Sequence, residues 1–349
     1  MTSPTASLVI VSYNGWEELQ RCLESVFQDD APPAEVIVVD NASSDGSPLR
    51  IRQHFPQVIL IEAPENLGFA AGCNLGAAHA RGNYLAFLNP DTIVARGWLR
   101  ALLDALENDP SAGLATSKIL LLDQPNRLNT CGNQIHLTGI TLCRGINHPA
   151  HSFDRLEPVN AVSGAAFMIR SDLFHRLGGF DEDLFLYMED ADLSLRARLA
   201  GYRCLYAPGS QVYHDYRLSF GPRKTFYQER NRYAMLLKAF RWRTLFLLAP
   251  ALLLAEAITW GFTLLYEPAR LGNKLEAYRW LWRNRRRLLD RRRSAQKLRR
   301  VPDRPLLLRS TAWLDFRQAV DGLLPRLAEA IFNPLFGLHK LLLGVVVWW

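Results

Sequence analysis

The stretch that decides the fold is Glu35-Val36-Ile37-Val38-Val39-Asp40, a β-branched apolar run that ends in a carboxylate. A run of this kind predicts a strand buried on both faces, as strands of parallel sheets are. Similar runs occur at 8–12, 58–62 and 84–88. Helical apolar spacing lies between and after them, at 19–26, 70–80 and 98–106. This alternation predicts an α/β domain with a mostly parallel sheet covered by helices.

Polar residues follow the first two predicted strands, where ligands of such sheets bind. Ser12, Tyr13 and Asn14 follow the first strand, and Asn14 is placed to cap the next helix. Asp40 opens a turn rich in Asx and Ser, and its carboxylate can accept hydrogen bonds from a nucleobase or a ribose. An ordinary Asx turn explains the same residues equally well. The chain has no G-x-x-x-x-G-K-[ST] motif and no G-x-G-x-x-G after the first strand, which argues against P-loop and dinucleotide sites.

The next two strand ends carry amides and a carboxylate. Gly68 opens a glycine pattern with a spacing of four residues, which favours close helix packing over a phosphate cradle, and Asn66 and Asn74 are the polar candidates there. Asn89 and Asp91 flank a proline after the fourth strand. Their oxygens suit a divalent cation that bridges a diphosphate, although a proline turn capped by Asp is the alternative.

Met188-Glu189-Asp190-Ala191-Asp192 places three carboxylates at the start of a predicted helix at 189–200. Acids at a helix start suit the helix dipole, so a charged first turn is one interpretation. The apolar approach at 184–188 also favours a catalytic base presented at a pocket edge. His214 lies further on, where a lone histidine is usually structural but becomes a metal ligand beside a carboxylate–phosphate site.

The remaining composition limits the class of protein. Five cysteines without a C-x-x-C pair indicate reduced thiols and a cytosolic location. No Lys or Arg precedes the first apolar run, which argues against a cleaved signal peptide. Residues 123–158 are polar and weakly periodic and predict a long irregular insertion, a kind of segment that is often functional, and 159–170 return to strand character.

The C-terminal part combines apolar and basic segments. Residues 227–243 predict a basic amphipathic helix, 244–266 contain a single charge at Glu256, and 331–349 are again apolar. Segment 268–300 has 13 Lys or Arg and two acids, a local charge of +11, so the rest of the chain sums to −4 within a total of +7. Such a block indicates either a solvated tail or a segment that binds nucleic acid or anionic lipid. Nucleic acid is the poorest choice, since no recognised binding module accompanies the arginines.

Taken together, these motifs resemble family 2 glycosyltransferases of the GT-A fold, the Rossmann-like nucleotide-diphospho-sugar transferases. The resemblance covers about residues 5–240 and rests on V-S-Y-N-G, V-V-D-N-A-S-S-D-G-S, E-N-L-G-F-A-A-G-C-N, F-L-N-P-D, G-A-A-F-M-I-R, G-G-F-D-E-D-L-F-L-Y-M-E-D-A-D-L and Y-H in this order. Each motif is weak, but the ordered set is specific. It is most similar to the bacterial rhamnosyltransferase-type branch that decorates cell-envelope glycans.

The resemblance assigns roles to the candidate residues. It implies that a nucleotide-sugar donor is bound by Asp40, by Ser12, Tyr13 and Asn14, by Asn66, Gly68 and Asn74, and by Asn89 and Asp91. Asp91 and His214 would hold Mg²⁺ or Mn²⁺ on the diphosphate, with Asn89 standing where many members have Asp. Asp190 would be the general base of an inverting transfer, Glu189 would shape the acceptor pocket, and Asp192 would stay a structural charge.

The expected function is therefore transfer of a sugar to a hydroxyl of a lipid-linked or polysaccharide acceptor. L-rhamnose from dTDP-rhamnose is the donor that the branch suggests. A processive polysaccharide synthase is the alternative, but 228–233 does not match Q-x-x-R-W. A non-catalytic glycan- or nucleotide-binding protein ranks lower, because Asp40, Asp91, Asp190 and His214 are all present.

The expected domains are a GT-A domain at 1–240 and a helical membrane-associated tail at 241–349. A single crossing by 244–266 would put the basic block opposite a cytosolic catalytic domain, against the positive-inside tendency. We therefore expect a peripheral or re-entrant association with the cytoplasmic face of the membrane, with the arginines on anionic lipid. A buried helix followed by a solvated basic helix is the other interpretation.

Overall fold

The computed structural model describes residues 5–216, 222–318, 320 and 322–349. Two compact units are present. The first, called the sheet unit, comprises Met1–Asn133, Cys143–Ala197 and Tyr202–Arg217. The second, called the helical unit, comprises Gln134–Leu142, Arg198–Gly201 and Leu218–Trp349.

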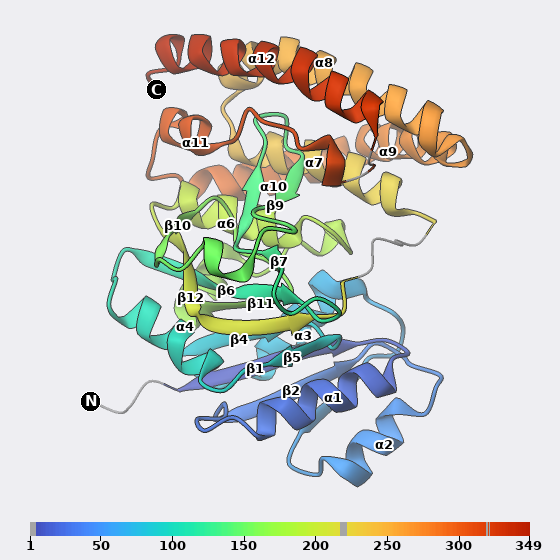
Figure 1. Ribbon diagram of the computed structural model, residues 1–349, viewed down its shortest axis with the longest axis vertical. Coiled ribbons are helices and arrows are strands. Elements are labelled where there is room, and N and C mark those ends of the chain that lie inside the picture. The colour runs from blue at the N-terminus through green and yellow to red at the C-terminus, as the bar shows by residue number, and fades with distance from the viewer. Residues whose placement is uncertain (1–4, 217–221, 319, 321) are drawn as a thin grey trace. The chain divides into compact units, whose positions relative to one another are not determined.

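The sheet unit is built on a mixed sheet (Figure 1), which within the described residues has ten strands. Its main path runs β10-β12-β6-β11-β4-β1-β2-β3, with β5 on β12 and β7 on β6. The bounds are β1 Ala6–Ser12, β2 Glu35–Asp40, β3 Ile59–Glu62, β4 Tyr84–Leu88, β5 Thr92–Val94, β6 Ala112–Leu121, β7 Leu128–Thr130, β10 Glu157–Val159, β11 Ala166–Arg170 and β12 Arg203–His214.

The N-terminal half of this sheet is parallel. β1 pairs in parallel with both β2 and β4, and β2 pairs with β3. β11 then runs antiparallel between β4 and β6. The carboxyl ends of β1, β2 and β4 therefore share one edge, and Ser12 lies directly beside Asp40 in the register.

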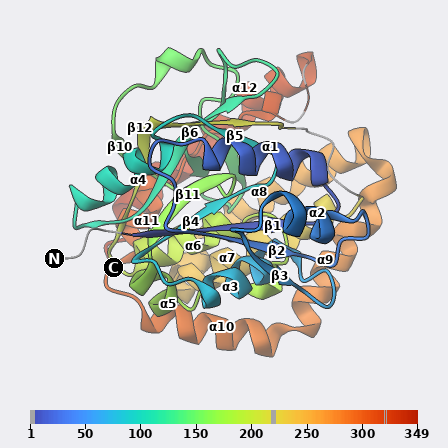
Figure 2. The ribbon, with the colours of Figure 1, turned by 90° about the horizontal axis from the view of Figure 1, so that it is seen from below.

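Helices cover both faces of the sheet (Figure 2). On one face, Leu8 and Ile10 of β1 share a buried core with residues of α1 and α4. On the other face, Gly72 and Gly76 bring α3 against Val11 and Val9. The helices are α1 Trp16–Phe27, α2 Ser47–His54, α3 Gly68–His79, α4 Trp98–Glu107, α5 Ser171–Leu177 and α6 Glu189–Leu199.

The predicted α/β architecture is confirmed, and two local expectations are wrong. Asn14 does not cap α1; its side-chain oxygen accepts a hydrogen bond from the Ser44 N–H at 2.8 Å, and the Asp45 carboxylate accepts from the first helical N–H, that of Trp16, at 3.3 Å. The insertion at 123–158 is not irregular throughout. β7 at its start pairs with β6 and β10 at its end pairs with β12, while β8 at Asn133–Ile135 and β9 at Thr141–Cys143 pair with each other between them.

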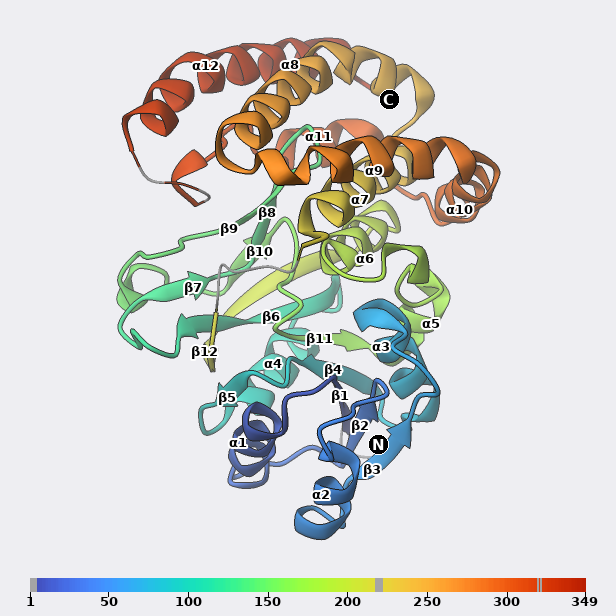
Figure 3. The same cartoon turned by 90° about the vertical axis from the view of Figure 1, so that its right-hand side faces the viewer.

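The helical unit is formed largely by helices (Figure 3). They are α7 Lys224–Ala239, α8 Trp242–Tyr266, α9 Leu271–Arg283, α10 Arg285–Lys297, α11 Asp303–Arg309 and α12 Leu323–Val346. Among the described residues, α8 and α12 are the helices long and apolar enough to cross a membrane, and only 17% and 22% of their apolar windows are buried. α7 groups by contacts with this unit, whereas the predicted boundary at 240 assigns it to the first domain.

Candidate active site

The carboxyl ends of β1 and β2 carry two buried polar atoms without partners. Asp40 accepts a hydrogen bond from the Ser43 N–H at 2.9 Å through Oδ2, while its Oδ1 has no hydrogen-bond partner. The neighbouring Ser12 hydroxyl is also buried and unpartnered. Such groups are costly unless a ligand completes them. Tyr13, which follows Ser12 in the chain, is 52% exposed, so the chain reaches the surface directly after β1.

Asn66 and Asn74 use their amides to hold loops in place. The Asn66 side-chain oxygen accepts from the Gly68 N–H at 2.9 Å and from the Asn41 amide at 3.2 Å. Asn74 accepts from the Phe180 N–H at 2.8 Å and donates to its carbonyl at 3.0 Å. These bonds indicate that both asparagines shape the site through the loops they tie.

Asp91 and His214 lie together, as predicted. The His214 Nε2 atom is 3.3 Å from Asp91 Oδ1, and that oxygen is buried with no hydrogen-bond partner. His214 Nδ1 lies 3.0 Å from the Asn129 side-chain oxygen, an acceptor that favours the tautomer with the proton on Nδ1 and the lone pair on Nε2. An orphaned carboxylate oxygen beside an oriented imidazole fits a divalent cation. Among the described residues, no group of three or more His, Cys, Asp or Glu forms a complete protein cage, so a ligand's oxygens would have to complete the coordination.

The loop that precedes α6 is strained. Phe185, Tyr187 and Met188 all have positive φ, at 61°, 67° and 68°. Non-glycine residues in this region concentrate at functional sites. The Phe185 carbonyl accepts from the Phe69 N–H at 2.8 Å, so the start of α3 holds the loop. Gly68 is required there, because a Cβ would lie 2.6 Å from the Phe185 ring at a φ of 78°.

The strained loop presents Asp190 with three hydrogen-bond donors. Its Oδ2 accepts from the Gly164 N–H at 2.8 Å and from the Asn133 amide at 3.1 Å. Its Oδ1 accepts from the Ala191 N–H at 2.7 Å. Asp190 is still partly exposed, whereas Glu189 is buried and its Oε2 has no partner. Asp190 is therefore the more accessible carboxylate of the two.

Burial decides the protonation of this pair. It raises the pKa of Asp190 above its ordinary value, and the donors from Gly164, Ala191 and Asn133 offset part of that rise. Burial, and then the charge of Asp190, raises the pKa of Glu189 well above its ordinary value. Two adjacent carboxyls in different surroundings can thus differ in protonation, which favours a charged Asp190 beside a neutral Glu189.

Asp192 is confirmed as structural. It is buried and forms an ion pair with Arg196 at 2.8 Å, one helical turn further on. Arg196 also donates to the carbonyls of Leu177 and Gly179. The pair therefore fixes the start of α6 against the loop that leads into it.

Short main-chain links join these groups into one site. Gly164 donates to Asp190, and the next residue, Ala165, accepts from the Asn89 N–H at 2.9 Å. Gly164 and Ala165 thus connect the predicted base to the Asn89-Pro90-Asp91 turn through their main-chain hydrogen bonds. On the other side, the Asn41 amide donates to the Gly68 carbonyl at 3.1 Å, which connects the turn after β2 to the start of α3.

Residues outside the predicted set also belong to the site. Asn129 orients His214, and Asn133 and Gly164 hold Asp190. The sequence signal for the two asparagines was weak, because both lie in the polar insertion that shows little periodicity. Gly164 belongs to the G-A-A-F-M-I-R motif before and within β11, but nothing in that motif predicts that its N–H donates to Asp190.

Unpartnered polar atoms at the ends of β1 and β2, the Asp91–His214 pair and the partly exposed Asp190 lie on one mixed sheet, an arrangement typical of nucleotide-sugar transferases of the GT-A fold. The family model described as "Glycosyl transferase family 2" matches residues 7–178. The chain belongs to this family and is a glycosyltransferase that uses a nucleotide-sugar donor.

Two named relatives agree with this assignment. The N-acetylglucosaminyl-diphospho-decaprenol L-rhamnosyltransferase of Mycobacterium tuberculosis is 31% identical over 242 residues, which cover 61% of this chain and 77% of the relative. Rhamnosyltransferase WbbL of Escherichia coli is 27% identical over 250 residues, covering 67% and 88%.

Two solved structures share the fold. GalNAc-T7 with UDP, GalNAc and Mn²⁺ has a TM-score of 0.57 at 20% identity, covering 67% of this chain and 48% of that one. The mannosyltransferase PcManGT from Pyrobaculum calidifontis, in complex with GDP-Man and Mn²⁺, has a TM-score of 0.53 at 17% identity, covering 99% and 88%.

Proposed function

We propose that this chain is an inverting glycosyltransferase that transfers L-rhamnose from dTDP-rhamnose to a hydroxyl of a lipid-linked acceptor in cell-envelope glycan synthesis. The observation that carries the inverting mechanism is the partly exposed Asp190 carboxylate, which three hydrogen-bond donors hold in place. Gly164, one of these donors, is followed by Ala165, which accepts from the first residue of the Asn89-Pro90-Asp91 turn. The donor and acceptor are supported by the likeness to the two rhamnosyltransferases, one of which is named for a decaprenol-linked acceptor.

The donor would lie along the carboxyl ends of β1, β2 and β4. Asp40 Oδ1 and the Ser12 hydroxyl are the buried unpartnered atoms that a base or ribose would complete, with Tyr13 and Asn14 at the rim. Asn66, Gly68 and Asn74 support the sugar side through the loops that they hold.

Asp91 and His214, with Asn89 beside them, would hold Mg²⁺ or Mn²⁺. This ion supplies neutralising charge for the leaving diphosphate. Asn129 keeps the Nε2 atom of His214 available, and Asp91 contributes the carboxylate.

Asp190 then acts on the acceptor. Its carboxylate takes the proton of the acceptor hydroxyl while that oxygen forms a bond to the anomeric carbon. The carbon–oxygen bond to the diphosphate breaks on the opposite side, and the nucleoside diphosphate leaves with the electron pair. The raised pKa of Asp190 makes it a stronger base than an exposed aspartate, and attack from the opposite face inverts the anomeric centre.

We place the enzyme on the cytoplasmic face of the membrane. Nucleotide sugars are cytosolic, and the poorly buried apolar helices α8 and α12 supply a membrane contact. The basic segment 268–300 would meet anionic headgroups.

The test is transfer by the purified full chain from a panel of nucleotide sugars to a synthetic polyprenyl-diphosphate N-acetylglucosamine, with Mg²⁺, Mn²⁺ or chelator. Asp190→Asn should lower kcat on the order of 10²–10⁴-fold while donor binding persists. Asp172→Asn, an exposed acid at the start of α5, is the matched control and should keep full activity. Full activity in Asp190→Asn would refute the base assignment, and transfer of another sugar only would refute rhamnose.

A further inference from the structure

The exposed face of α8 is its most apolar face. Phe246, Leu253 and Leu264 are 79%, 71% and 55% exposed, and Pro250 and Ala257 lie exposed between them at helical spacing. The buried side of the same helix is mostly small or polar and comprises Thr244, Leu248, Ala251, Ala255 and Thr263. This arrangement is the reverse of a soluble helix, which hides its bulky apolar side chains.

α12 also exposes a continuous apolar face, although it buries Phe336 and Leu343 as well as Glu329 and Asn333. Its exposed stripe comprises Leu327, Ile331, Leu335, Leu338, Leu342 and Val345. The two helices run antiparallel and adjacent (Figures 1 and 3), since the Trp349 indole donates to the Thr244 hydroxyl at 2.8 Å and His339 contacts the Leu247 carbonyl at 3.0 Å. Of the described large apolar side chains that are exposed, only Tyr13, Leu49, Ile59 and Leu156 lie outside the helical unit.

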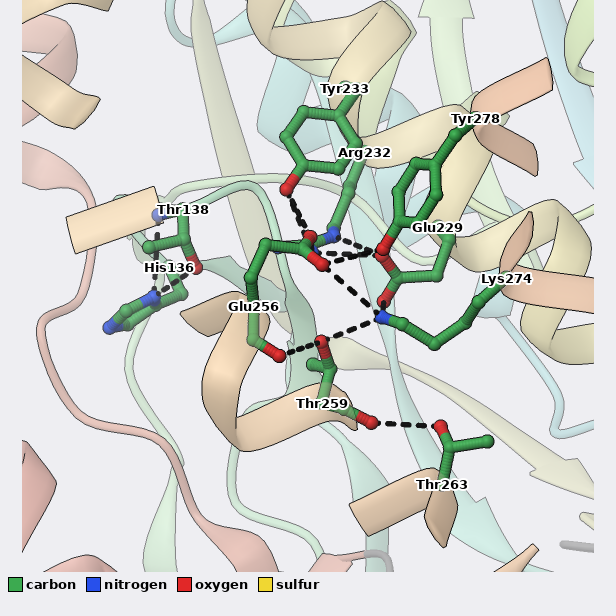
Figure 4. A network of polar contacts seen from close by, with 10 residues as sticks. All are labelled: His136, Thr138, Glu229, Arg232, Tyr233, Glu256, Thr259, Thr263, Lys274 and Tyr278. Carbon is green, nitrogen blue, oxygen red and sulfur yellow. Dashed lines mark hydrogen bonds and ion pairs between the residues drawn. The ribbon is translucent and has the colours of Figure 1, made fainter. Parts of the chain in front are cut away.

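The inner side of α8 carries an ion network at the middle of the helix (Figure 4). Glu256 forms ion pairs with Arg232 of α7 and with Lys274 of α9, the latter at 3.6 Å. Lys274 also pairs with Glu229 at 3.1 Å, and the Tyr278 hydroxyl donates to Glu256 at 2.5 Å. Glu256, the single charge in the apolar segment 244–266, therefore fixes the rotation of α8 about its own axis where it packs on α7 and α9.

The middle of α12 is also tied to polar groups. The Asn333 amide accepts from the Leu314 N–H at 2.9 Å and donates to the Leu314 carbonyl at 3.1 Å. The Glu329 carboxylate accepts from the Phe316 N–H at 3.1 Å. Residues 312–315 are not helical, so irregular main chain lies against the centre of this helix.

We propose that α8 and α12 form a monotopic anchor, which lies in the plane of the membrane with its outer faces in one leaflet. This inference deepens the proposed function, on which it rests for the lipid-linked acceptor. If α8 crossed the bilayer, its midpoint would carry Glu256, Arg232 and Lys274 to the centre of the hydrocarbon, where ionised groups are costly. Crossing by α12 would bring the irregular chain at 312–315 to the same depth, which lipid does not accommodate. Lying in the plane keeps both polar layers outside the hydrocarbon.

The residues at the edge of the apolar face formed by α8 and α12 are of the kind found at a bilayer surface. Trp242, Trp348 and Trp349 gather where the start of α8 meets the end of α12, and the Arg243 guanidinium stacks on the Trp349 ring at 3.8 Å. Tryptophan and arginine side by side are typical of the headgroup layer. The excess of cations in 268–300 matches anionic lipid.

The decisive experiment determines on which side of the membrane each end of α8 lies, and it does not depend on sugar transfer. Trp242→Cys and Leu265→Cys mark the two ends of α8 in a full chain with Cys143→Ser, and an impermeant maleimide is applied to sealed bacterial membrane vesicles of each orientation. A monotopic anchor exposes both ends on the cytoplasmic side alone. Labelling of the two ends from opposite sides would overturn the proposal.

A second measurement tests the outer face. Phe246→Asp with Leu253→Asp should weaken sedimentation with phosphatidylglycerol–phosphatidylethanolamine vesicles by roughly tenfold or more for each side chain. Leu49→Asp, a similarly exposed leucine on α2, is the matched control and should leave binding unchanged. Unchanged binding in the double variant would refute the outer face as the anchor. Donor binding, measured on each variant, shows that the fold is intact and separates this outcome from a failure of the proposed transferase activity.

Discussion

The carboxylate of Asp190 owes its position to residues that are remote in the sequence. Asn133, 57 positions earlier, donates to its Oδ2, and Gly164, 26 positions earlier, donates to the same oxygen. The Thr130 hydroxyl contacts the Asn133 side-chain oxygen at 3.2 Å, which turns the amide N–H groups toward Asp190. The insertion between β6 and β11 thus serves the predicted base.

Replacement of Asn133 should change the pH dependence of the reaction. The Asn133 hydrogen bond favours the charged form of Asp190, so Asn133→Ala should raise its pKa further. Because the base acts when deprotonated, the acidic limb of the kcat profile should move to higher pH, with kcat at the plateau lower on the order of tenfold.

The measurement is a set of pH–rate profiles at saturating donor, with the KM for donor as a second readout. Asn83→Ala, which removes an exposed amide at the end of β4 opposite to Asn89, is the control and should leave the profile in place. An acidic limb that stays where it is in Asn133→Ala would show that Asn133 has only a structural role.

A second residue prediction concerns metal binding. Asn129→Ala removes the partner that orients the His214 imidazole, so the Mn²⁺ concentration for half-maximal activity should rise about 10–100-fold. His214→Gln should show at least the same weakening. Direct titration of Mn²⁺ by calorimetry, in the presence of nucleoside diphosphate, checks this, and equal affinity in all three proteins would contradict the metal assignment.

At the scale of elements, α3 depends on its glycines. A Cβ on Gly76 would lie 2.5 Å from Val9 Cγ1, on a stiff β-branched side chain in the centre of the sheet. We expect Gly76→Ala to lower the free energy of unfolding by about 1–3 kcal/mol, measured by urea denaturation. Gly272→Ala on α9 meets no atom within 4 Å and should be neutral or stabilising. A neutral Gly76→Ala would mean that α3 is less closely packed than described.

The elements were largely predictable, and their connections less so. The strands at 35–40 and 84–88 have the predicted bounds, because continuous β-branched and aromatic runs have few alternatives. The strand expected over 159–170 is shorter, since β11 begins at Ala166, after Gly164 has donated to Asp190 and Ala165 has accepted from Asn89. The positive φ of Phe185, Tyr187 and Met188 had no sequence signal, as none of them is glycine.

At the scale of the molecule, the charge of the chain is concentrated in its helical unit. Arg285 and Arg286 are exposed on α10 within the basic segment. Replacing both by Gln should weaken binding to phosphatidylglycerol vesicles by about fivefold for each charge, at about 1 kcal/mol per arginine, and should leave binding to neutral vesicles unchanged. Equal losses on both kinds of vesicle, measured by flotation, would contradict an electrostatic contribution.

The sequence by itself determined the α/β order of the sheet unit, the family and most of the candidate site, because hydrophobic period and strand-end motifs are local properties of the chain. Asp91 and His214 were predicted together and lie together. Only the tertiary structure decided which carboxylate of the acidic cluster is accessible, which asparagines support it, and which side of α8 faces outward. These features depend on which loops and helices meet in space, and an apolar segment such as 244–266 has the same composition whether Glu256 faces lipid or an arginine.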